Sequence, residues 1–241
     1  MQLLDLPPEV LSIVMENLSK KELFNCSLTC TSLFAVSNPV LWGSPWSPYY
    51  QDWKKLSLIV QKVPLPVEMP RFFLGSMIRL LDFTDIHYVI GDELLESMAP
   101  FIPNLKTLII NSPSRGLTDR GIGWICLHCP RLMNLSLIRC RNISNSSLFT
   151  ISKSLLLMHR LHLEDNHLIN DDGLESLLGS LQLLSNIYLS RLTKIRLNFE
   201  PKFSKHLSTV TLEDMMNEDD DDDVAFVKQL LGAGVVTKII K

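Results

Sequence analysis

The sequence predicts an α/β protein in which a small helical block precedes a solenoid with a curved parallel sheet and helices on its convex side. Two observations lead to this fold class. Residues 6–42 contain helix start signals followed by apolar side chains at helical spacing. From residue 78 onward, an apolar pattern of the form L-x-x-L-x-L returns at a nearly constant interval, which indicates a repeat architecture.

The first helix is expected to begin at Pro7 and Pro8, because the fixed φ of proline suits a first helical turn. Glu9 supplies the negative charge that a helix N-terminus favours. The apolar stripe of this helix consists of Val10, Leu11, Val14 and Leu18.

A second helix is predicted after Ser19, because Ser19 and Glu22 have the spacing of a capping box. This helix should carry Leu23, Cys26 and Leu28 toward a shared core. A block this short buries little surface, so it is expected to be stabilised by packing against another surface.

Asn38 and Pro39 predict a break in the chain before Leu41 and Trp42. With this ending, the block resembles the F-box, the adaptor-binding module of SCF-type ubiquitin ligases. The positions that carry the resemblance are Leu6, Pro7, Glu9, Val10, Leu11, Leu18, Glu22, Leu23, Cys30, Phe34, Leu41 and Trp42.

The resemblance implies that residues 1–46 bind a Skp-family adaptor and, through it, a cullin and a ring-finger subunit. An ordinary amphipathic helical cap, whose leucine and tryptophan side chains belong to a core, stays open as the other interpretation of the block. The adaptor-binding residues that the F-box resemblance implies are Leu6, Pro7, Glu9, Val10, Leu11, Val14, Leu18, Leu23, Leu41 and Trp42.

About six repeat units are expected within residues 76–241, at intervals of 27, 27, 26, 26 and 23 residues. A second matching piece, at residues 117–122 and 169–174, indicates a turn, a helix cap and a helix after the strand. The apolar triplets of the strands are Ile78, Leu81 and Phe83; Leu105, Leu108 and Ile110; Leu132, Leu135 and Leu137; Met158, Leu161 and Leu163; Leu184, Ile187 and Leu189; and Leu207, Val210 and Leu212.

These units resemble leucine-rich repeats, and the segment from Cys129 to Cys140 resembles their cysteine-containing subtype, which is commonly joined to an F-box. Such units bury a continuous core only when they stack. Residues 47–75 form a connecting segment, in which Trp53, Leu56 and Leu58 suggest a degenerate first repeat. The irregular part of this connection is marked by Pro64, Pro66 and Pro70.

The last residues, 224–241, are expected to cap the open end of the solenoid. The acidic run at 218–223 predicts a solvated loop. Asp223 is placed to cap a helix that ends at Gly232. The closing strand is predicted from Val235, Val236, Ile239 and Ile240.

Composition excludes several classes of function. A net charge of −3 argues against nucleic-acid binding, which needs a clustered basic face. No apolar run approaches the roughly 20 residues that cross a bilayer, and the start of the chain predicts a capped helix rather than a leader. Five cysteines, an odd number, form no disulfide framework and suit a reducing compartment. We expect a protein of the cytoplasm, the nucleus or both.

No metal site, cofactor or catalytic site is expected. Cys126, His128, Cys129 and Cys140 are zinc-ligand types, but the repeat register assigns Cys129 to a helix end and Cys140 to the end of the next strand. The six histidines lie at scattered repeat positions, without the spacing of a known catalytic motif. A nucleophile, a base and its orienting partner can still meet in space.

These features predict a non-catalytic substrate receptor of an SCF-type ubiquitin ligase, which leads its target to ubiquitination and proteasomal degradation. One alternative is an interaction scaffold that binds the adaptor without ubiquitin transfer. Another is a purely structural repeat protein that binds no adaptor.

The concave sheet face is the expected target site, because period-2 alternation sends the side chains between the core residues to that face. Arg160 has only His162 beside it, so an unmodified surface or peptide is expected rather than a phosphorylated one. The expected target-binding residues are Ile109, Ile138, Arg160, His162 and Tyr188. The same face should hold Thr107, Asn111, Asn134, Ser136, Glu164, Asn186 and Ser190.

Overall fold

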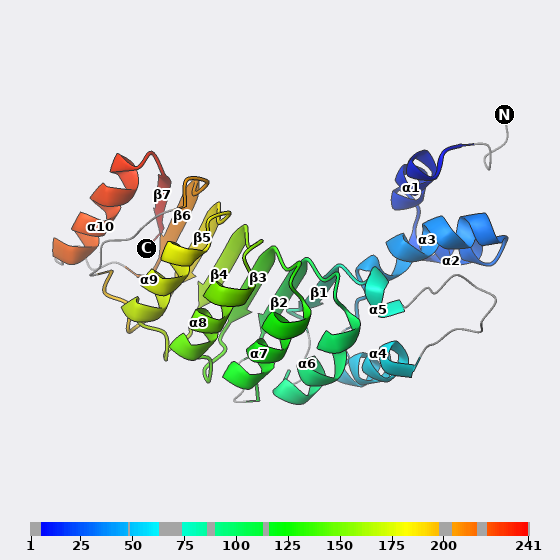
Figure 1. Cartoon of the computed structure of the whole chain (residues 1–241), viewed down its shortest axis with the longest axis horizontal. Coiled ribbons are helices and arrows are strands. Elements are labelled where there is room, and N and C mark those ends of the chain that lie inside the picture. Colours follow the sequence, from blue (N-terminus) through cyan, green and yellow to red (C-terminus); the bar gives the residue numbers. More distant parts are fainter. Residues whose placement is uncertain are drawn as a thin grey trace.

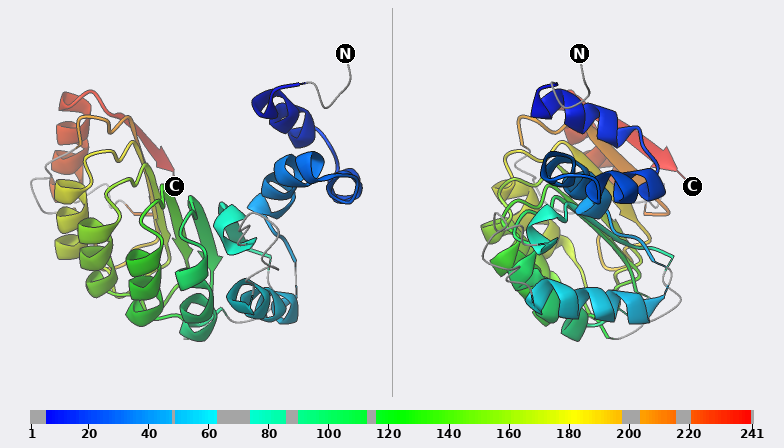
Figure 2. Two further views of the ribbon diagram at one scale, coloured as in Figure 1. Left: turned by 45° about the vertical axis from the view of Figure 1, so that its right-hand side comes forward. Right: turned by 90° about the vertical axis from the view of Figure 1, so that its right-hand side faces the viewer.

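The computed structural model describes residues 6–47, 49–62, 74–85, 90–112, 116–197, 204–215 and 221–240, without the side chains of 62 and 221–224. Helices of the N-terminal block lie at one end of a long array, and a parallel sheet with a layer of helices makes up the rest (Figure 1). The sheet curves with its helices on the outer side (Figure 2). This is the predicted fold class. Among the described residues, no helix combines the length and the apolar character needed to cross a membrane.

The N-terminal block contains three helices around a small core of its own. The predicted capping box is present: the Ser19 N–H donates to a Glu22 carboxylate oxygen at 2.8 Å, and the Glu22 N–H donates to the Ser19 hydroxyl at 3.4 Å. Met15, Leu23 and Leu33 are the buried centre of the core. The helices are α1 (Pro8–Glu16), α2 (Lys20–Ser27) and α3 (Thr31–Gly43).

Two predictions about this block are wrong. Helix α3 runs through Asn38 and Pro39, where a break was expected. Pro39 lacks the N–H that would bond the Ala35 carbonyl, and α3 continues despite the loss of this one hydrogen bond. In the same turn the Asn38 side chain donates to the Phe34 carbonyl at 2.9 Å. Leu28 follows α2 as its C-cap and is 70% exposed, so it faces away from the core.

The connecting segment holds a helix, α4 (Tyr50–Lys62), where a degenerate strand unit was suggested. Trp53, Leu56 and Val60 are buried on one side of α4, at helical spacing, whereas Leu58 is exposed. Helix α4 contacts α6 and so extends the outer row of helices (Figure 1). The three prolines at 64, 66 and 70 lie outside the described residues.

Seven parallel strands pair in chain order, from β1 to β7. The pairing register reproduces the repeat intervals, because Leu81 pairs with Leu108, Leu108 with Leu135 and Leu135 with Leu161. The strands are β1 (Leu80–Phe83), β2 (Thr107–Asn111), β3 (Asn134–Ile138), β4 (Arg160–Glu164), β5 (Asn186–Ser190), β6 (Thr209–Glu213) and β7 (Val236–Ile240).

The core lies between the sheet and the outer helices. Every apolar residue of the six predicted triplets is buried, with Leu207 the most exposed at 8%. The helical elements of this region are α5 (Leu74–Met77), α6 (Asp92–Met98), the 3₁₀ helix η2 (Ala99–Phe101), α7 (Asp119–His128), α8 (Asn145–Ser154), α9 (Asp171–Ser180) and α10 (Asp221–Gly232).

The outer helices are linked by their first residues. One Asp92 carboxylate oxygen accepts the backbone N–H of Thr118 at 2.8 Å and that of Gly121 at 3.1 Å, and the other accepts the Thr118 hydroxyl at 2.6 Å. Asp119 in turn binds the backbone N–H and the hydroxyl of Ser144, at 2.8 and 2.6 Å. Asn145 accepts the N–H of Asn170 at 3.0 Å. Each of these acceptors thus holds the N-cap residue of the next helix.

The C-terminal part contains the predicted helix and strand with two differences. Helix α10 begins at Asp221, so residues 221–223 belong to its first turn rather than to a loop, and Asp223 does not precede it. Residues 216–220 lie outside the described residues. Val235 packs into the core, whereas Val236, Ile239 and Ile240 of β7 are exposed.

Candidate functional site

Two stripes of apolar side chains run along α1. Leu11 and Met15 point into the core of the block, at the i, i+4 spacing of one helix face. Val10, Ile13 and Val14 occupy the other face and are 40%, 60% and 37% exposed. A helix that is apolar on both faces needs a second contact to shield the outer one.

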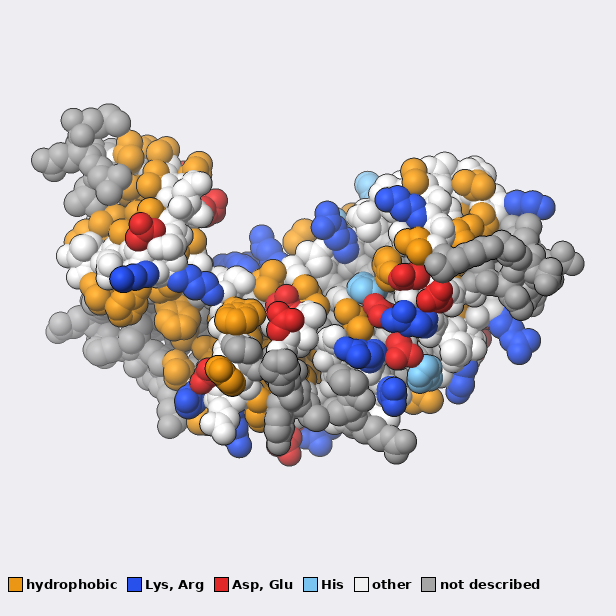
Figure 3. Space-filling view, turned by 180° about the vertical axis from the view of Figure 1, so that it is seen from behind, with side chains coloured by type: hydrophobic (Ala, Val, Ile, Leu, Met, Phe, Trp, Pro, Cys, Tyr) orange, Lys and Arg blue, Asp and Glu red, His pale blue; other side chains and the backbone are white. Residues whose placement is uncertain are grey.

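Helix α2 and its C-cap residue add to the exposed apolar surface. Phe24 is 53% exposed, and Leu28 lies four residues further on. Apolar side chains gather over the N-terminal helices in the space-filling view (Figure 3). We refer to Val10, Ile13, Val14, Phe24 and Leu28 as the N-terminal apolar surface.

The structure divides the expected adaptor-binding residues into three groups. Pro7, Glu9, Val10 and Val14 are exposed on or just before α1. Leu11 and Leu23 are buried in the core of the block and are not surface residues, a correction to their expected role in direct contact. The half-buried residues are Leu6, Leu18, Leu41 and Trp42.

Sequence reasoning missed Ile13 and Phe24. A signal for Ile13 was present, because five of the nine residues of α1 are apolar, more than a single face can hold. Phe24 had a weaker signal, its position next to Leu23, which turns it about a quarter of a helical turn away.

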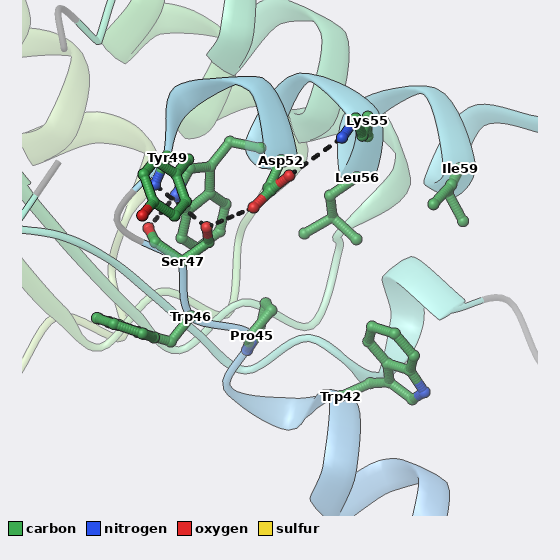
Figure 4. A pocket seen from close by; sticks show the side chains of 10 residues that line it. Trp42, Pro45, Trp46, Ser47, Tyr49, Asp52, Lys55, Leu56 and Ile59 are labelled. Carbon is green, nitrogen blue, oxygen red and sulfur yellow. Dashed lines mark hydrogen bonds and ion pairs between the residues drawn. The ribbon is translucent and has the colours of Figure 1, made fainter. Parts of the chain in front are cut away.

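A second apolar feature is a hollow of about 380 Å³ between the end of α3 and helix α4 (Figure 4). Trp42, Pro45 and Trp46 lie on one side of it, and Leu56 and Ile59 of α4 lie on the other. The Trp42 indole N–H donates to the Asn38 side-chain oxygen at 3.2 Å. Trp42 therefore lines this hollow and is positioned by the turn of α3 before it.

Asp52 is the acidic residue that lines the same hollow. Its carboxylate accepts the Ser47 hydroxyl at 2.8 Å and contacts the Lys55 ammonium at 3.3 Å (Figure 4). The Ser47 hydrogen bond, followed by the one from Lys55, holds the pKa of Asp52 below its usual range. Asp52 thus remains a charged rim residue that already has partners.

On the inner, strand side of the solenoid, side chains of five strands form a hollow of about 510 Å³, here called the concave hollow. Of the expected target-binding residues, the structure brings Ile109, Arg160, His162 and Tyr188 together there, and it leaves Ile138 outside the lining. The other polar side chains of the lining are Thr107, Asn134, Ser136, Asn186, Thr209 and Thr211.

Ser190 is a correction to the predicted concave face, because its side chain is buried rather than presented there. Sequence reasoning also missed Thr209 and Thr211 as lining residues. Their signal was available, since the repeat register pairs Thr209 with Asn186 and Thr211 with Tyr188.

His162 is the best-connected side chain of the concave hollow. Its Nδ1 lies 3.1 Å from the Ser136 hydroxyl, and its Nε2 lies 3.1 Å from a Glu164 carboxylate oxygen. The Tyr188 ring meets the imidazole edge-on, with centroids 4.4 Å apart. Burial lowers the pKa of His162, and Glu164 opposes this shift only in part. A neutral imidazole that donates from Nε2 and accepts at Nδ1 fits all of these contacts.

Ser136, His162 and Glu164 stand in the order of a nucleophile, a base and its orienting carboxylate. Such a set also needs donors for a developing oxyanion. Strands β3 and β4 pair with neighbours on both sides, so their backbone N–H groups are engaged in the sheet. The geometry therefore fits a fixed polar recognition surface better than a hydrolytic centre.

Glu164 also belongs to an ion network at the carboxyl ends of the strands. Arg191 pairs with Glu164 and lies 3.8 Å from Asp214. In the view from behind, side chains of both charges gather over the C-terminal repeats (Figure 3). Arg191 thus faces two carboxylates, so this rim of the concave hollow keeps a net negative charge.

Cys126, Cys129 and Cys140 are all buried. The Cys129 N–H ends α7 by donating to the Ile125 carbonyl at 2.8 Å, and Cys140 follows β3, as the repeat register predicts. Burial raises the pKa of each of the three thiols to about 12. Across the described ranges, no three His, Cys, Asp or Glu side chains gather as they would around a metal ion.

The N-terminal block matches one known protein family. Residues 3–46 match the family described as F-box-like, so the N-terminal part of this chain is F-box-like. A 98-residue stretch is 31% identical to the BTB/POZ domain-containing protein FBL11 of Arabidopsis thaliana. The match covers 41% of this chain and 10% of that protein, so the chain spans only about a tenth of its relative.

Two solved structures share part of the fold at low similarity. One is the complex of Rad7 and Elc1 in yeast, with a TM-score of 0.48 and 20% identity over 63% of this chain and 38% of the matched chain. The other is the TLR13–ssRNA13 complex, with a TM-score of 0.43 and 20% identity over 58% of this chain and 20% of the matched chain.

Proposed function

We propose that this chain is a substrate receptor of an SCF-type ubiquitin ligase. The observation that carries the proposal is the F-box-like match over residues 3–46, on a helical block whose outer face is apolar. In this proposal residues 1–46 are the F-box, and residues 76–241 form leucine-rich repeats of the cysteine-containing subtype. The buried thiols of Cys129 and Cys140, one at a helix end and one after a strand, support that subtype.

The N-terminal apolar surface supports docking on a Skp-family adaptor. A standard protein interface buries roughly 1,200–2,000 Å² and depends on a few apolar anchors near its centre. Ile13, Phe24 and Leu28 are each more than half exposed and lie on or beside α1 and α2, which both contact α3. Covering them with a partner removes apolar area from water without reorganising the core of the block.

In this proposal the solenoid holds the target protein close to the conjugating enzyme. The lining residues of the concave hollow belong to β2–β6, outside the N-terminal block. These strands lie on the inner side of the solenoid, away from the outer helices (Figure 2), so adaptor and target could be bound at the same time. Ubiquitin transfer would be performed by other subunits, and the receptor would raise the local concentration of target lysines near the conjugating enzyme. The receptor itself needs no cofactor in this role.

The test is a pull-down of the full chain from cells, read for adaptor and cullin together. We expect both proteins with the wild type and neither with Ile13→Asp, which places a charge on the N-terminal apolar surface. Leu127→Asp is the matched control, because Leu127 is a 71% exposed apolar residue on α7, far from that surface. Loss of neither protein with Ile13→Asp would contradict the docking surface, and absence of adaptor from the wild-type sample would contradict the proposal.

The second candidate function is an adaptor-bound interaction scaffold without ubiquitin transfer. The same F-box-like block supports it, since that block accounts only for adaptor binding. Recovery of adaptor without cullin would favour the scaffold over the ligase receptor.

A further inference from the structure

Among the described residues that line the concave hollow, one is a cation, and it lies near the middle. Arg160 is the first residue of β4, the central strand of the five from β2 to β6 that line the hollow. Arg160 is the charged residue among those that line the hollow, and its side chain is exposed. No carboxylate within the described ranges forms an ion pair with it. An unpaired guanidinium in a hollow offers parallel donors that match a carboxylate.

We propose that the concave hollow binds an extended acidic segment of a partner protein, with an Asp or Glu side chain on Arg160. The identity of this partner as a ubiquitination target rests on the proposed function. Two asparagines flank the cation, because Asn134 and Asn186 pair with Arg160 in the strand register. The Ser185 hydroxyl lies 2.8 Å from the Asn186 side-chain oxygen and 2.9 Å from the His159 carbonyl, and the Asn186 NH₂ group supplies two N–H donors.

The charge of the hollow selects a carboxylate over a phosphate. Phosphate recognition uses clustered arginines, because a phosphoryl group carries close to two negative charges. Here Arg160 stands alone, and His162, which burial keeps neutral, adds no second positive charge. One guanidinium balances one carboxylate.

The dimensions of the hollow indicate an extended segment that passes through it. Four strand spacings of about 4.8 Å separate β2 from β6, which gives a length of about 19 Å, or roughly six extended residues. Arg160 lies at the midpoint, so the acidic residue should occupy the middle of the segment. A C-terminal carboxylate on Arg160 would instead leave one half of the lining, with Tyr188 and Thr211, without a ligand.

Charges at the opposite rim fix the side on which the acid binds. Glu164 and Glu213 are the last residues of β4 and β6, roughly 13 Å along the strand from their first residues. This distance exceeds the Debye length of about 8 Å at physiological salt. The segment is therefore expected to present its carboxylate at the amino ends of the strands and uncharged groups toward the carboxyl ends.

The experiment uses a positional-scanning library of hexapeptides with acetylated and amidated ends on the full chain. We expect enrichment of Asp and Glu at the third or fourth position. In Arg160→Gln the best acidic peptide should bind roughly 10- to 100-fold more weakly, as expected when a charge-assisted hydrogen bond is lost. Lys153→Gln, the same charge change on outer helix α8, is the control and should bind like wild type.

Three results would overturn the proposal: an unchanged acidic preference in Arg160→Gln, preference for phosphoserine over Glu at the central position, or binding only to a parallel library with free C-terminal carboxylates. An unchanged unfolding midpoint shows that Arg160→Gln is folded. Adaptor pull-down from the same preparations separates the two proposals. Acidic preference without adaptor binding would refute the ligase role alone, whereas adaptor binding without acidic preference would refute only this inference.

Discussion

Two glycines in one helix should respond oppositely to the same substitution. Gly121 and Gly123 both lie in α7. A Cβ at Gly121 would lie 2.5 Å from a carboxylate oxygen of Asp92 and 2.8 Å from the Leu117 side chain, whereas a Cβ at Gly123 meets nothing within 4 Å. Gly121→Ala is therefore expected to displace Asp92, and Gly123→Ala is expected to fit.

The magnitude follows from the hydrogen bonds that Asp92 makes. The displaced oxygen accepts two backbone N–H groups, from Thr118 and from Gly121. Hydrogen bonds to a charged group contribute about 1.5–3 kcal/mol each to the free energy of unfolding. Replacing glycine by alanine within a helix stabilises the helix by about 1 kcal/mol. Losing both bonds costs about 3–6 kcal/mol, so Gly121→Ala should lower the free energy of unfolding by about 2–5 kcal/mol, and Gly123→Ala should raise it by up to about 1 kcal/mol.

Urea unfolding followed by circular dichroism measures both variants against the wild type. The expected difference of about 2–6 kcal/mol between the two variants is well above the error of such a comparison. If Gly121→Ala were as stable as Gly123→Ala to within about half a kcal/mol, the link between Asp92 and the next helix would contribute nothing, and the reasoning would be refuted.

Leu6→Ala with Pro7→Ala should abolish co-precipitation of the adaptor while the repeats stay folded, and unchanged co-precipitation would count against the F-box assignment. Leu135→Ala should lower the free energy of unfolding by roughly 2–5 kcal/mol, because its side chain is only 2% exposed. Exposed Leu157→Ala should change it by less than about half a kcal/mol, and equal effects of these two leucine substitutions would mean a wrong register. Burial lowers the pKa of His162, so the unfolded chain takes up the proton first as pH falls below about 6.5, and stability is lost there. His162→Gln should lose less stability between pH 7.5 and pH 5.5 in thermal melts, and parallel losses would show that His162 is not responsible.

The repeat region was predictable from the sequence because its signal is redundant. Each strand contributes the same triplet, and Leu108, Leu135 and Leu161 pair in the register that their spacing predicts. The caps at Thr118 and Asn170 were likewise readable, because a short polar side chain followed by an acidic residue marks a helix start. Repetition turns a weak local pattern into a reliable one.

The errors arose where a pattern occurred once. Trp53 and Leu56 have the spacing of the repeat, but the same spacing fits a helix face, and buried Val60 extends it as a helix. Pro39 predicts a helix break, but the loss of one backbone donor does not end α3. On the surface, the sequence could name side chains such as Ile109 and Tyr188 but not show which ones share a hollow.

The linked first residues of the outer helices give the solenoid a direction. Asp92, Asp119 and Asn145 each bond the N-cap residue of the helix that follows, so these cap bonds run from each unit to the unit after it. In a repeat protein the stability of each unit includes its contacts with the neighbouring units. Here part of that contact energy comes from helix caps that each unit provides for the next unit and does not receive from it. Local opening of one unit should therefore uncap its C-terminal neighbour first, and fraying of the array should travel away from the N-terminal helices. Local unfolding that starts within the repeats should therefore reach the N-terminal helices, which would bind the adaptor, last.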